Sequence, residues 1–221
     1  MIKEAKDNGA DLIKTQIFSV KNLKPGPWDN DGRREIYLKS ELTDKKFKVL
    51  FDYAKKLKID FFASALNKDG VDILRKYQTK YIKIASAESR NYNLIKYASK
   101  YFKNIIISTG ATKYSEIIKL FKININKSKI ILLHCNSSYP CNYKKLNLPR
   151  IDKLKKLSKK VGFSDHSPGI YGSVLALKYN PMFIEKHFTT DQKLPGRDNE
   201  LAILPSDLKI LKNFILINED V

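Results

Sequence analysis

Short apolar segments of strand length alternate with segments of helical spacing along almost the whole chain. The apolar segments are rich in Ile, Val and Phe, and seven are present, at 11–18, 60–66, 81–88, 104–110, 129–138, 161–167 and 182–189. Spacing typical of amphipathic helices lies between them, at 45–58, 68–77, 92–102, 114–122 and 205–217. Strands that alternate with helices in this way form right-handed βαβ units, so we expect one parallel sheet.

Polar side chains gather towards the carboxyl ends of the expected strands. A (β/α)8 barrel carries its chemistry at the carboxyl ends of all its strands, whereas a doubly wound sheet does so around one switch point. We therefore predict an α/β fold of the TIM (β/α)8 barrel type, with seven strands present and the first strand missing. No glycine-rich dinucleotide or phosphate fingerprint follows a strand, which disfavours the nucleotide-binding classes.

Length and composition indicate one cytoplasmic domain. The 221 residues suffice for one core, and we expect a single incomplete barrel over 1–221. There is no cleavable leader pattern and no run of the roughly 18 apolar residues that a membrane span needs. Cys135 and Cys141 lack a second pair at zinc-ligand spacing, and we expect two reduced thiols.

The net charge of +19 raises the possibility of a nucleic-acid-binding face. Only six of the 42 basic residues are Arg, however, although Arg is the better bidentate ligand of phosphate. The lysines are spread over every expected helix. This distribution favours solvated helix faces, and we expect no nucleic-acid partner.

Two of the three histidines end consecutive strands, His166 in VGFSDHSP and His187 in MFIEKHFTT. Side chains alternate along a strand, so Ser164 and His166 share one face, as do Glu185 and His187. Neighbouring strands lie about 4.8 Å apart, and both imidazoles then reach one point at the mouth of a barrel. Two neutral imidazoles can hold a divalent cation and leave positions for substrate and water.

A histidine in an apolar strand can also be a hydrogen-bonded core residue. We predict that role for His134, which lies midway through 129–138. Glu185 has two possible roles, because its carboxylate can orient a ligand or simply balance the charge of Lys186 and its neighbours.

Lys14 and Lys83 stand within apolar strands, where an ammonium group without an anion is costly. Ammonium and hydroxyl groups around a water-poor pocket suit a small phosphate or carboxylate ester. Alternatively, the lysine side chains extend to the barrel rim. The hydroxyl groups expected to line the same mouth belong to Ser64, Ser86, Ser108, Ser137 and Ser164.

Seven short motifs follow one another in order along nearly the entire chain. They are IKTQ (13–16), KIASAE (83–88), IISTG (106–110), LLHCNSSYP (132–140), GFSDHS (162–167), EKHFT (185–189) and LPGRD (194–198). Together they resemble the sialic acid (N-acetylneuraminate) synthase family. The resemblance implies a transferase of polysaccharide biosynthesis that condenses phosphoenolpyruvate with N-acetylmannosamine or a related amino sugar. The products would be a sialic-type nonulosonic acid and phosphate.

The resemblance also implies roles for individual residues. His166 and His187 would be the ligands of a divalent cation, Mn²⁺ or Mg²⁺, that polarises the sugar aldehyde. The phosphoenolpyruvate site would consist of Lys14, Ser64, Lys83, Ser86, Ser108, Ser137 and Ser164.

The remaining catalytic residues implied by the resemblance concern the sugar and the reacting centre. Gln16, Tyr139 and Asp198 would face the sugar, and Glu88 stands where the family has a carboxylate near the reacting centre. The choice of sugar cannot be read from the chain, because we expect the sugar pocket to lie largely in loops such as 24–37.

The chain departs from the family pattern at several points. Ser64 stands in ASA where the family usually has Ser-Thr-Pro, Ser137 stands where Asn is usual, and Arg197 stands where Pro is common. We expect the family's first strand and its C-terminal antifreeze-like domain to be absent. Two hypotheses follow. In the first, the chain is an enzyme of this type that forms a homodimer at full length. In the second, it is a noncatalytic fragment, which either binds phosphate-type anions or needs a complementing chain.

Overall fold

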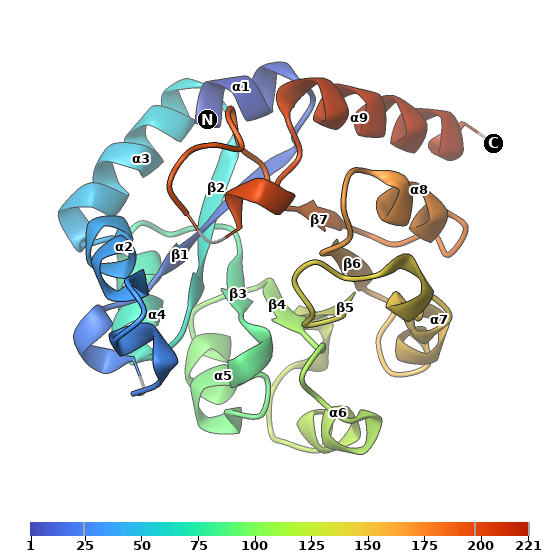
Figure 1. Cartoon of the computed structure of the whole chain (residues 1–221). Coiled ribbons are helices and arrows are strands. Elements are labelled where there is room, and N and C mark those ends of the chain that lie inside the picture. The colour runs from blue at the N-terminus through green and yellow to red at the C-terminus, as the bar shows by residue number, and fades with distance from the viewer. Residues whose placement is uncertain (24, 197, 221) are drawn as a thin grey trace.

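A parallel sheet organises the computed structural model, which describes residues 1–23, 25–196 and 198–220; Arg197 of the LPGRD motif lies outside them. Within this part of the chain the sheet has seven strands, in the order β1 to β7. The strands are β1 Leu12–Ile17, β2 Asp60–Ala65, β3 Ile82–Ile84, β4 Ile105–Ser108, β5 Ile130–Cys135, β6 Val161–Asp165 and β7 Ile184–Lys186. Each lies within a predicted segment, and the α/β architecture of the TIM-barrel type is confirmed (Figure 1).

Helices surround the sheet on its outer side (Figure 1). They are α1 Ile2–Asp7, α2 Arg33–Ser40, α3 Asp44–Lys56, α4 Lys68–Lys76, α5 Tyr92–Ser99, α6 Tyr114–Leu120, α7 Arg150–Lys155, α8 Tyr171–Leu177 and α9 Pro205–Glu219. The five predicted helices correspond to α3, α4, α5, α6 and α9. The segment 24–37, expected as a loop, is different, because α2 begins inside it. None of the helices within the described ranges is long and apolar enough to cross a lipid bilayer.

Local side chains fix where some of these helices begin. Thr43 Oγ1 accepts a hydrogen bond from the Lys46 amide at the start of α3 (3.3 Å). Asn67 Oδ1 accepts one from the Gly70 amide at the start of α4 (3.0 Å). Both caps satisfy amide groups that a helix start leaves without an internal partner. The α4 cap follows directly after β2 and so fixes the chain beside the carboxyl end of that strand.

Alternation of side chains along the strands produces two apolar layers. Outward-facing residues, among them Ile105 and Phe163, pack in the large cluster between the sheet and the helices. Inward-facing residues form a second, smaller cluster of Phe62, Ile106, Ile131 and Leu133. This inner cluster is the floor of the barrel interior. The inward positions nearer the carboxyl ends of the strands are polar, and they lie above that floor.

Candidate active site

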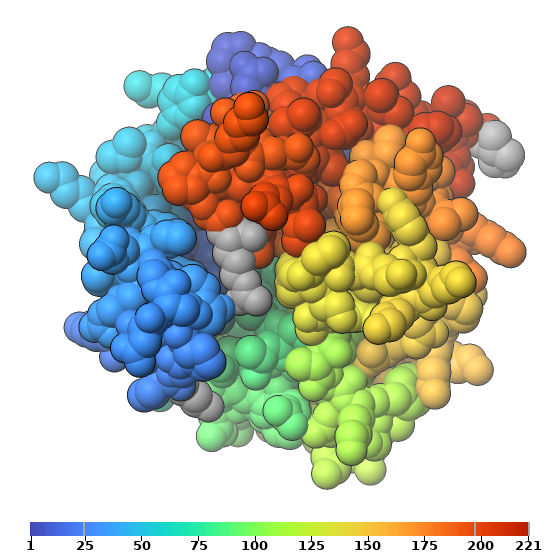
Figure 2. Space-filling model, in the orientation of Figure 1, coloured from blue at the N-terminus to red at the C-terminus, as the bar shows by residue number. Residues whose placement is uncertain are grey.

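Inward-facing polar residues from different strands meet at the carboxyl end of the sheet. The strand register pairs Ser64 with both Gln16 and Lys83, and pairs Ser164 with Glu185. Figure 2 shows that segments far apart in sequence, from the blue region of α2 to the orange loop before α9, meet around the centre of one face. This mouth of the barrel is where we place the candidate site.

Glu185 is the electrostatic centre of the mouth. Its Oε1 atom accepts hydrogen bonds from the Lys83 ammonium group and from Ser164 Oγ (2.9 Å). Lys14 Nζ lies 3.8 Å from the same oxygen. The Lys83 side chain is only 7% exposed and Glu185 is 21% exposed, so these charges are largely removed from water. The three charged groups carry a net positive charge, because two ammonium groups share one carboxylate.

The pKa values of the cluster reflect both burial and charge pairing. Burial by itself raises the pKa of Glu185, but Lys14 and Lys83 lower it by more, so the pKa lies below its usual range. Burial lowers the pKa of Lys14, and Glu185 opposes that change. Neither lysine extends freely to the rim, the alternative left open by the sequence, because both contact the Glu185 carboxylate.

His166 and His187 lie next to each other, with ring centroids 5.5 Å apart. His166 Nδ1 lies 2.5 Å from the carbonyl oxygen of Asn136 and can only donate to it. That hydrogen bond leaves Nε2 as the acceptor, and Tyr139 Oη (3.1 Å) and Ser164 Oγ (3.3 Å) lie within reach of it. A lone pair directed into the mouth from a ring fixed in this way is typical of a metal-binding histidine.

Both imidazoles are neutral near physiological pH. Burial is the main cause of the lowered pKa of His166. Burial and then Lys14 lower the pKa of His187 to about 4. Neutral imidazoles fit a divalent cation, since the ring must be deprotonated to ligate. Within the described ranges no group of three or more His, Cys, Asp or Glu side chains is arranged for a metal, so the two rings would supply only part of a coordination shell.

Two residues assigned to the sugar lie beside the histidines. The Tyr139 ring is centred 4.1 Å from the His166 ring and 5.9 Å from the His187 ring. Asp198 Oδ2 lies 3.9 Å from His187 Nδ1. The third, Gln16, stands on β1 with its side chain exposed at the mouth.

The other serine positions differ in burial. Ser64 and Ser108 are buried on β2 and β4. Ser86 Oγ accepts a hydrogen bond from the Ala111 amide (2.7 Å). Ser137 is exposed, and its Oγ lies against Gly110, where an added Cβ would come within 2.6 Å of it. The approach of the two loops therefore requires glycine at position 110.

Glu88 is separated from the charge cluster in the described part of the chain. Its carboxylate accepts a hydrogen bond from Asn91 Nδ2 (2.9 Å), in the short 3-10 helix Ser86–Glu88 and the turn that follows it. No contact joins Glu88 to Lys14, Lys83 or either histidine of the mouth among the described residues. Glu88 thus lies on the loop after β3 rather than in the charge cluster.

The third histidine and Lys186 lie outside the mouth. His134 is buried on the outward face of β5, and its Nε2 lies 2.7 Å from the carbonyl oxygen of Leu146. Lys186 also points outward and pairs with Asp165, so it does not balance Glu185. The separation of Lys186 from Glu185 could have been predicted from the sequence, since side chains alternate along a strand and adjacent residues lie on opposite faces.

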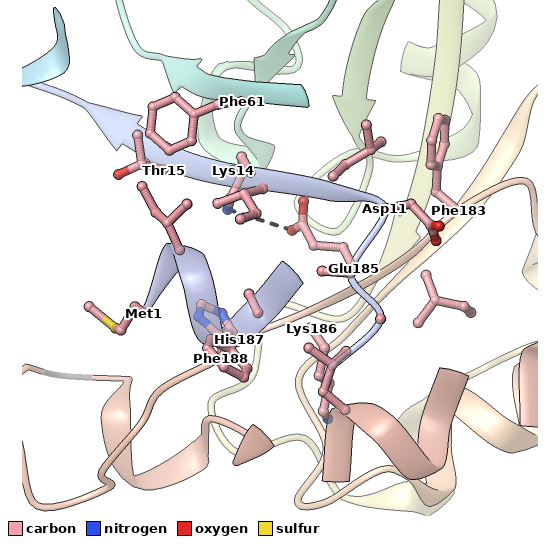
Figure 3. Close-up of a pocket in the computed structure, with 18 of the residues that line it drawn as sticks. Met1, Asp11, Lys14, Thr15, Phe61, Phe183, Glu185, Lys186, His187 and Phe188 are labelled. Atoms are coloured by element: carbon pink, nitrogen blue, oxygen red, sulfur yellow. Dashed lines mark ion pairs between the residues drawn. The ribbon is translucent and has the colours of Figure 1, made fainter. Parts of the chain in front are cut away.

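A cavity of about 640 Å³ separates β1 from β7 (Figure 3). Its walls come from these two strands and from α1 and α9, and its mouth end contains Lys14, Glu185 and His187. Phe62, Ile106 and Leu133 of the inner cluster line it from within. An ion pair between Lys212 of α9 and Asp11 (2.9 Å) lies on the outer side. The cavity thus extends laterally from the mouth between β1 and β7, and α1 and α9 line its outer side.

Comparisons with known proteins agree with this geometry. A model of the NeuB family matches residues 1–220. An uncharacterized protein, MJ1065 of Methanocaldococcus jannaschii, is 36% identical over 99% of this chain and 65% of its own length. An N,N'-diacetyllegionaminic acid synthase of Campylobacter jejuni is 35% identical over 96% of this chain and 68% of its own length.

Among solved structures, the N-acetylneuraminic acid (sialic acid) synthetase of Leptospira borgpetersenii superposes with a TM-score of 0.89 at 33% identity. The match covers 100% of this chain and 77% of that one. The present chain spans 65% and 68% of the two curated relatives, so about a third of each relative has no counterpart in it. The matched part contains the whole sheet and every residue assigned to the mouth.

Proposed function

Because this chain belongs to the NeuB family, we propose that it condenses phosphoenolpyruvate with N-acetylmannosamine or a related N-acetylated amino sugar. The products are a sialic-type nonulosonic acid and inorganic phosphate. The observation that carries this proposal is the meeting of two ammonium groups, Lys14 and Lys83, with two neutral imidazoles in one buried mouth. The relatives named as legionaminic and sialic acid synthases support the reaction class but differ in sugar.

The lysines would bind the anionic groups of phosphoenolpyruvate. Hydrogen bonds from charged donors are strong where water is excluded, and Lys83 is nearly buried. The hydroxyl groups of Ser64, Ser108 and Ser164 lie in the same inward layer and can donate to the remaining oxygens. An arriving anion would compete with Glu185 for both lysines, because that carboxylate holds them in the free protein.

His166 and His187 would hold the divalent cation, Mn²⁺ or Mg²⁺. When bound, the cation would supply polarisation of the open-chain sugar's aldehyde. Asn136 fixes the tautomer of His166. Tyr139 and Asp198, both beside the histidine rings, would orient the sugar.

The proposed reaction forms one carbon–carbon bond. The enol carbon of phosphoenolpyruvate bonds to the aldehyde carbon, and the aldehyde oxygen takes up a proton. Water adds at C2, the C2–O bond to phosphate breaks, and phosphate leaves. The chain's own residues bind the two substrates side by side, which lowers the entropic part of the barrier. They also exclude water from the charged contacts, which strengthens those contacts.

Replacing Lys83 by alanine is expected to weaken the binding of phosphoenolpyruvate, or of inorganic phosphate, by roughly 1.5–3 kcal/mol, because one charge-assisted contact is lost. Calorimetric titration measures the change. The matched control is Lys56→Ala on the exposed face of α3. An equal loss in the Lys56 variant would show that diffuse positive charge, rather than the mouth, attracts the anion.

The lateral cavity supports a second candidate function. In the described sheet β1 pairs only with β2, and β7 only with β6. Unpaired strand edges favour association with other strands. The second candidate is therefore a chain that binds phosphate-type anions but turns over only when a complementing chain fills the cavity between β1 and β7.

Phosphate release with Mn²⁺ present, combined with a sizing column, distinguishes the two candidates. If the second candidate holds, the chain binds phosphoenolpyruvate, elutes as an oligomer and releases little phosphate from phosphoenolpyruvate and N-acetylmannosamine. Robust turnover by a monomeric chain would contradict it and support the synthase on its own.

A further inference from the structure

A buried ion pair lies directly behind the two histidines. Asp165 and Lys186 are register partners at the ends of β6 and β7. Asp165 Oδ2 lies 3.1 Å from Lys186 Nζ, and the side chains are 0% and 4% exposed. Figure 3 shows the Glu185 side chain directed towards Lys14 and the Lys186 side chain directed away from both. The pair therefore belongs to the outer side of the sheet and is separate from the charge cluster of the mouth.

Hydrogen bonds satisfy both members of the pair. Asp165 Oδ1 accepts from the amide (2.8 Å) and the hydroxyl (2.6 Å) of Ser167. Asp165 Oδ2 also accepts from Ser173 Oγ of α8 (2.8 Å). Lys186 donates in addition to the carbonyl oxygen of Ser167. The network thus ties the ends of both strands to the turn that follows His166 and to α8.

Gly172 makes room for this network. A Cβ atom at position 172 would lie 2.3 Å from Ser167 Oγ and 2.9 Å from each carboxylate oxygen of Asp165. Even alanine would displace these groups. The close approach of α8 to the ion pair therefore requires glycine.

Stability alone is a weak explanation for such a pair. Desolvation of two buried charges can cancel their attraction, and well-packed apolar residues often stabilise a fold equally well. The position of the pair is more informative. Asp165 precedes His166 and Lys186 precedes His187, so the contact between the charges fixes the two backbone segments that carry the imidazoles.

We propose that Asp165 and Lys186 are positioning residues, which hold the His166 and His187 rings at the separation that a divalent cation requires. This inference rests on the proposed function, in which the two histidines hold that cation. The pair acts through the backbone of the strand ends and touches neither the substrate nor the cation. Ser173 has a smaller part, because it secures only one oxygen of Asp165.

The test separates positioning from general stabilisation by comparing Asp165→Asn, Lys186→Met and the double variant. Each single variant leaves one buried charge unpaired, so its melting temperature falls and its Mn²⁺ affinity falls about 10–100-fold, as for other groups that orient metal ligands. The double variant removes both charges and recovers much of the melting temperature. Its Mn²⁺ affinity stays at least about tenfold below that of the wild type, because the strand ends are no longer joined.

Mn²⁺ binding to the complete chain is measured by paramagnetic resonance, and unfolding by calorimetry without metal. Phe47→Leu, which removes packing from a fully buried ring on α3, is the control that lowers the melting temperature but leaves Mn²⁺ affinity unchanged. Ser173→Ala keeps both charges and provides a variant that folds, with a loss of affinity below about tenfold.

Two results would overturn the inference. In the first, Mn²⁺ affinity in the double variant returns together with the melting temperature, or Phe47→Leu loses as much affinity as Asp165→Asn. In the second, the wild type binds Mn²⁺ and every variant, including Ser173→Ala, binds it equally well. A wild type that binds no Mn²⁺ would instead remove the metal from the proposed function, and the inference with it.

Discussion

Alanine at His166 or at His187 is expected to abolish the Mn²⁺ site, whereas alanine at His134 leaves it largely intact. The two mouth histidines lie 5.5 Å apart by ring centroid, and each would supply one of the two imidazole ligands of the proposed site. Loss of a direct ligand should exceed the roughly 10–100-fold loss that follows removal of a group that only orients one. His134 is held on the other face of the sheet by Leu146 and cannot reach the mouth.

Manganese titration monitored by paramagnetic resonance measures all three variants under the same conditions. His134→Ala serves as the internal control, because its buried ring packs against Phe163 and its removal should lower the melting temperature. Equal loss of Mn²⁺ binding in the three variants would show that the histidines support folding and do not ligate a metal.

The architecture and the inward layer of the mouth were predictable because both depend on a period of two along the strands. All seven strands in the described part of the chain lie where apolar segments were found. The same alternation directed Lys83, Ser164 and His166 towards the barrel interior, and the sequential strand order brought them together. The direction of a side chain near the end of a strand can be predicted from sequence, since it follows from alternation along that strand and not from distant partners.

Pairings between charges were not predictable in the same way. Lys83 and Glu185 are 102 positions apart, and only the curvature of the sheet brings β1 and β3 towards β7. Lys186 was considered as a partner of Glu185 because the two residues are adjacent in sequence. Alternation along β7 places their side chains on opposite faces of the sheet, and Lys186 pairs with Asp165. The Asp165–Lys186 pair could have been suspected from that rule, since each residue precedes a histidine on neighbouring strands.

Loops were the least predictable part. Helix α2 begins inside the segment 24–37, where a loop was expected. Glu88 and Ser137 lie on segments after strand ends, where no periodicity constrains side-chain direction. The role of Glu88 therefore depends on resemblance, and no strand register supports Ser137, whereas Lys83 and Ser164 are supported by the register of the sheet.

Replacing Glu185 by glutamine is expected to destabilise the free protein and to strengthen its binding of phosphate. The substitution leaves the nearly buried Lys83 without a carboxylate, and breaking a buried pair of this kind costs about 3 kcal/mol. A loss of that size corresponds to a fall of roughly 10 °C in the melting temperature for a chain of this length. Phosphate binds more tightly, roughly tenfold, because it no longer displaces a carboxylate from two lysines.

The stability difference should depend on pH in one direction. The pKa of Glu185 is lowered from its ordinary value of 4.5 in the folded protein. A carboxyl group of this kind contributes its full stabilisation above its pKa in the unfolded chain and loses it as the pH falls towards the lower folded value. The melting temperatures of wild type and Glu185→Gln should therefore differ most near neutrality, and the difference should begin to shrink as the pH falls below 4.5.

Calorimetric titration measures phosphate binding. Melting curves at about five pH values between about pH 3 and 7, where carboxyl groups titrate, measure the stability difference. Glu219→Gln is the matched control, since Glu219 is exposed at the end of α9 and its replacement should change neither quantity appreciably. Weaker phosphate binding in Glu185→Gln would show that Glu185 helps to bind the anion, in which case the carboxylate orients the lysines towards the substrate and does not compete with it.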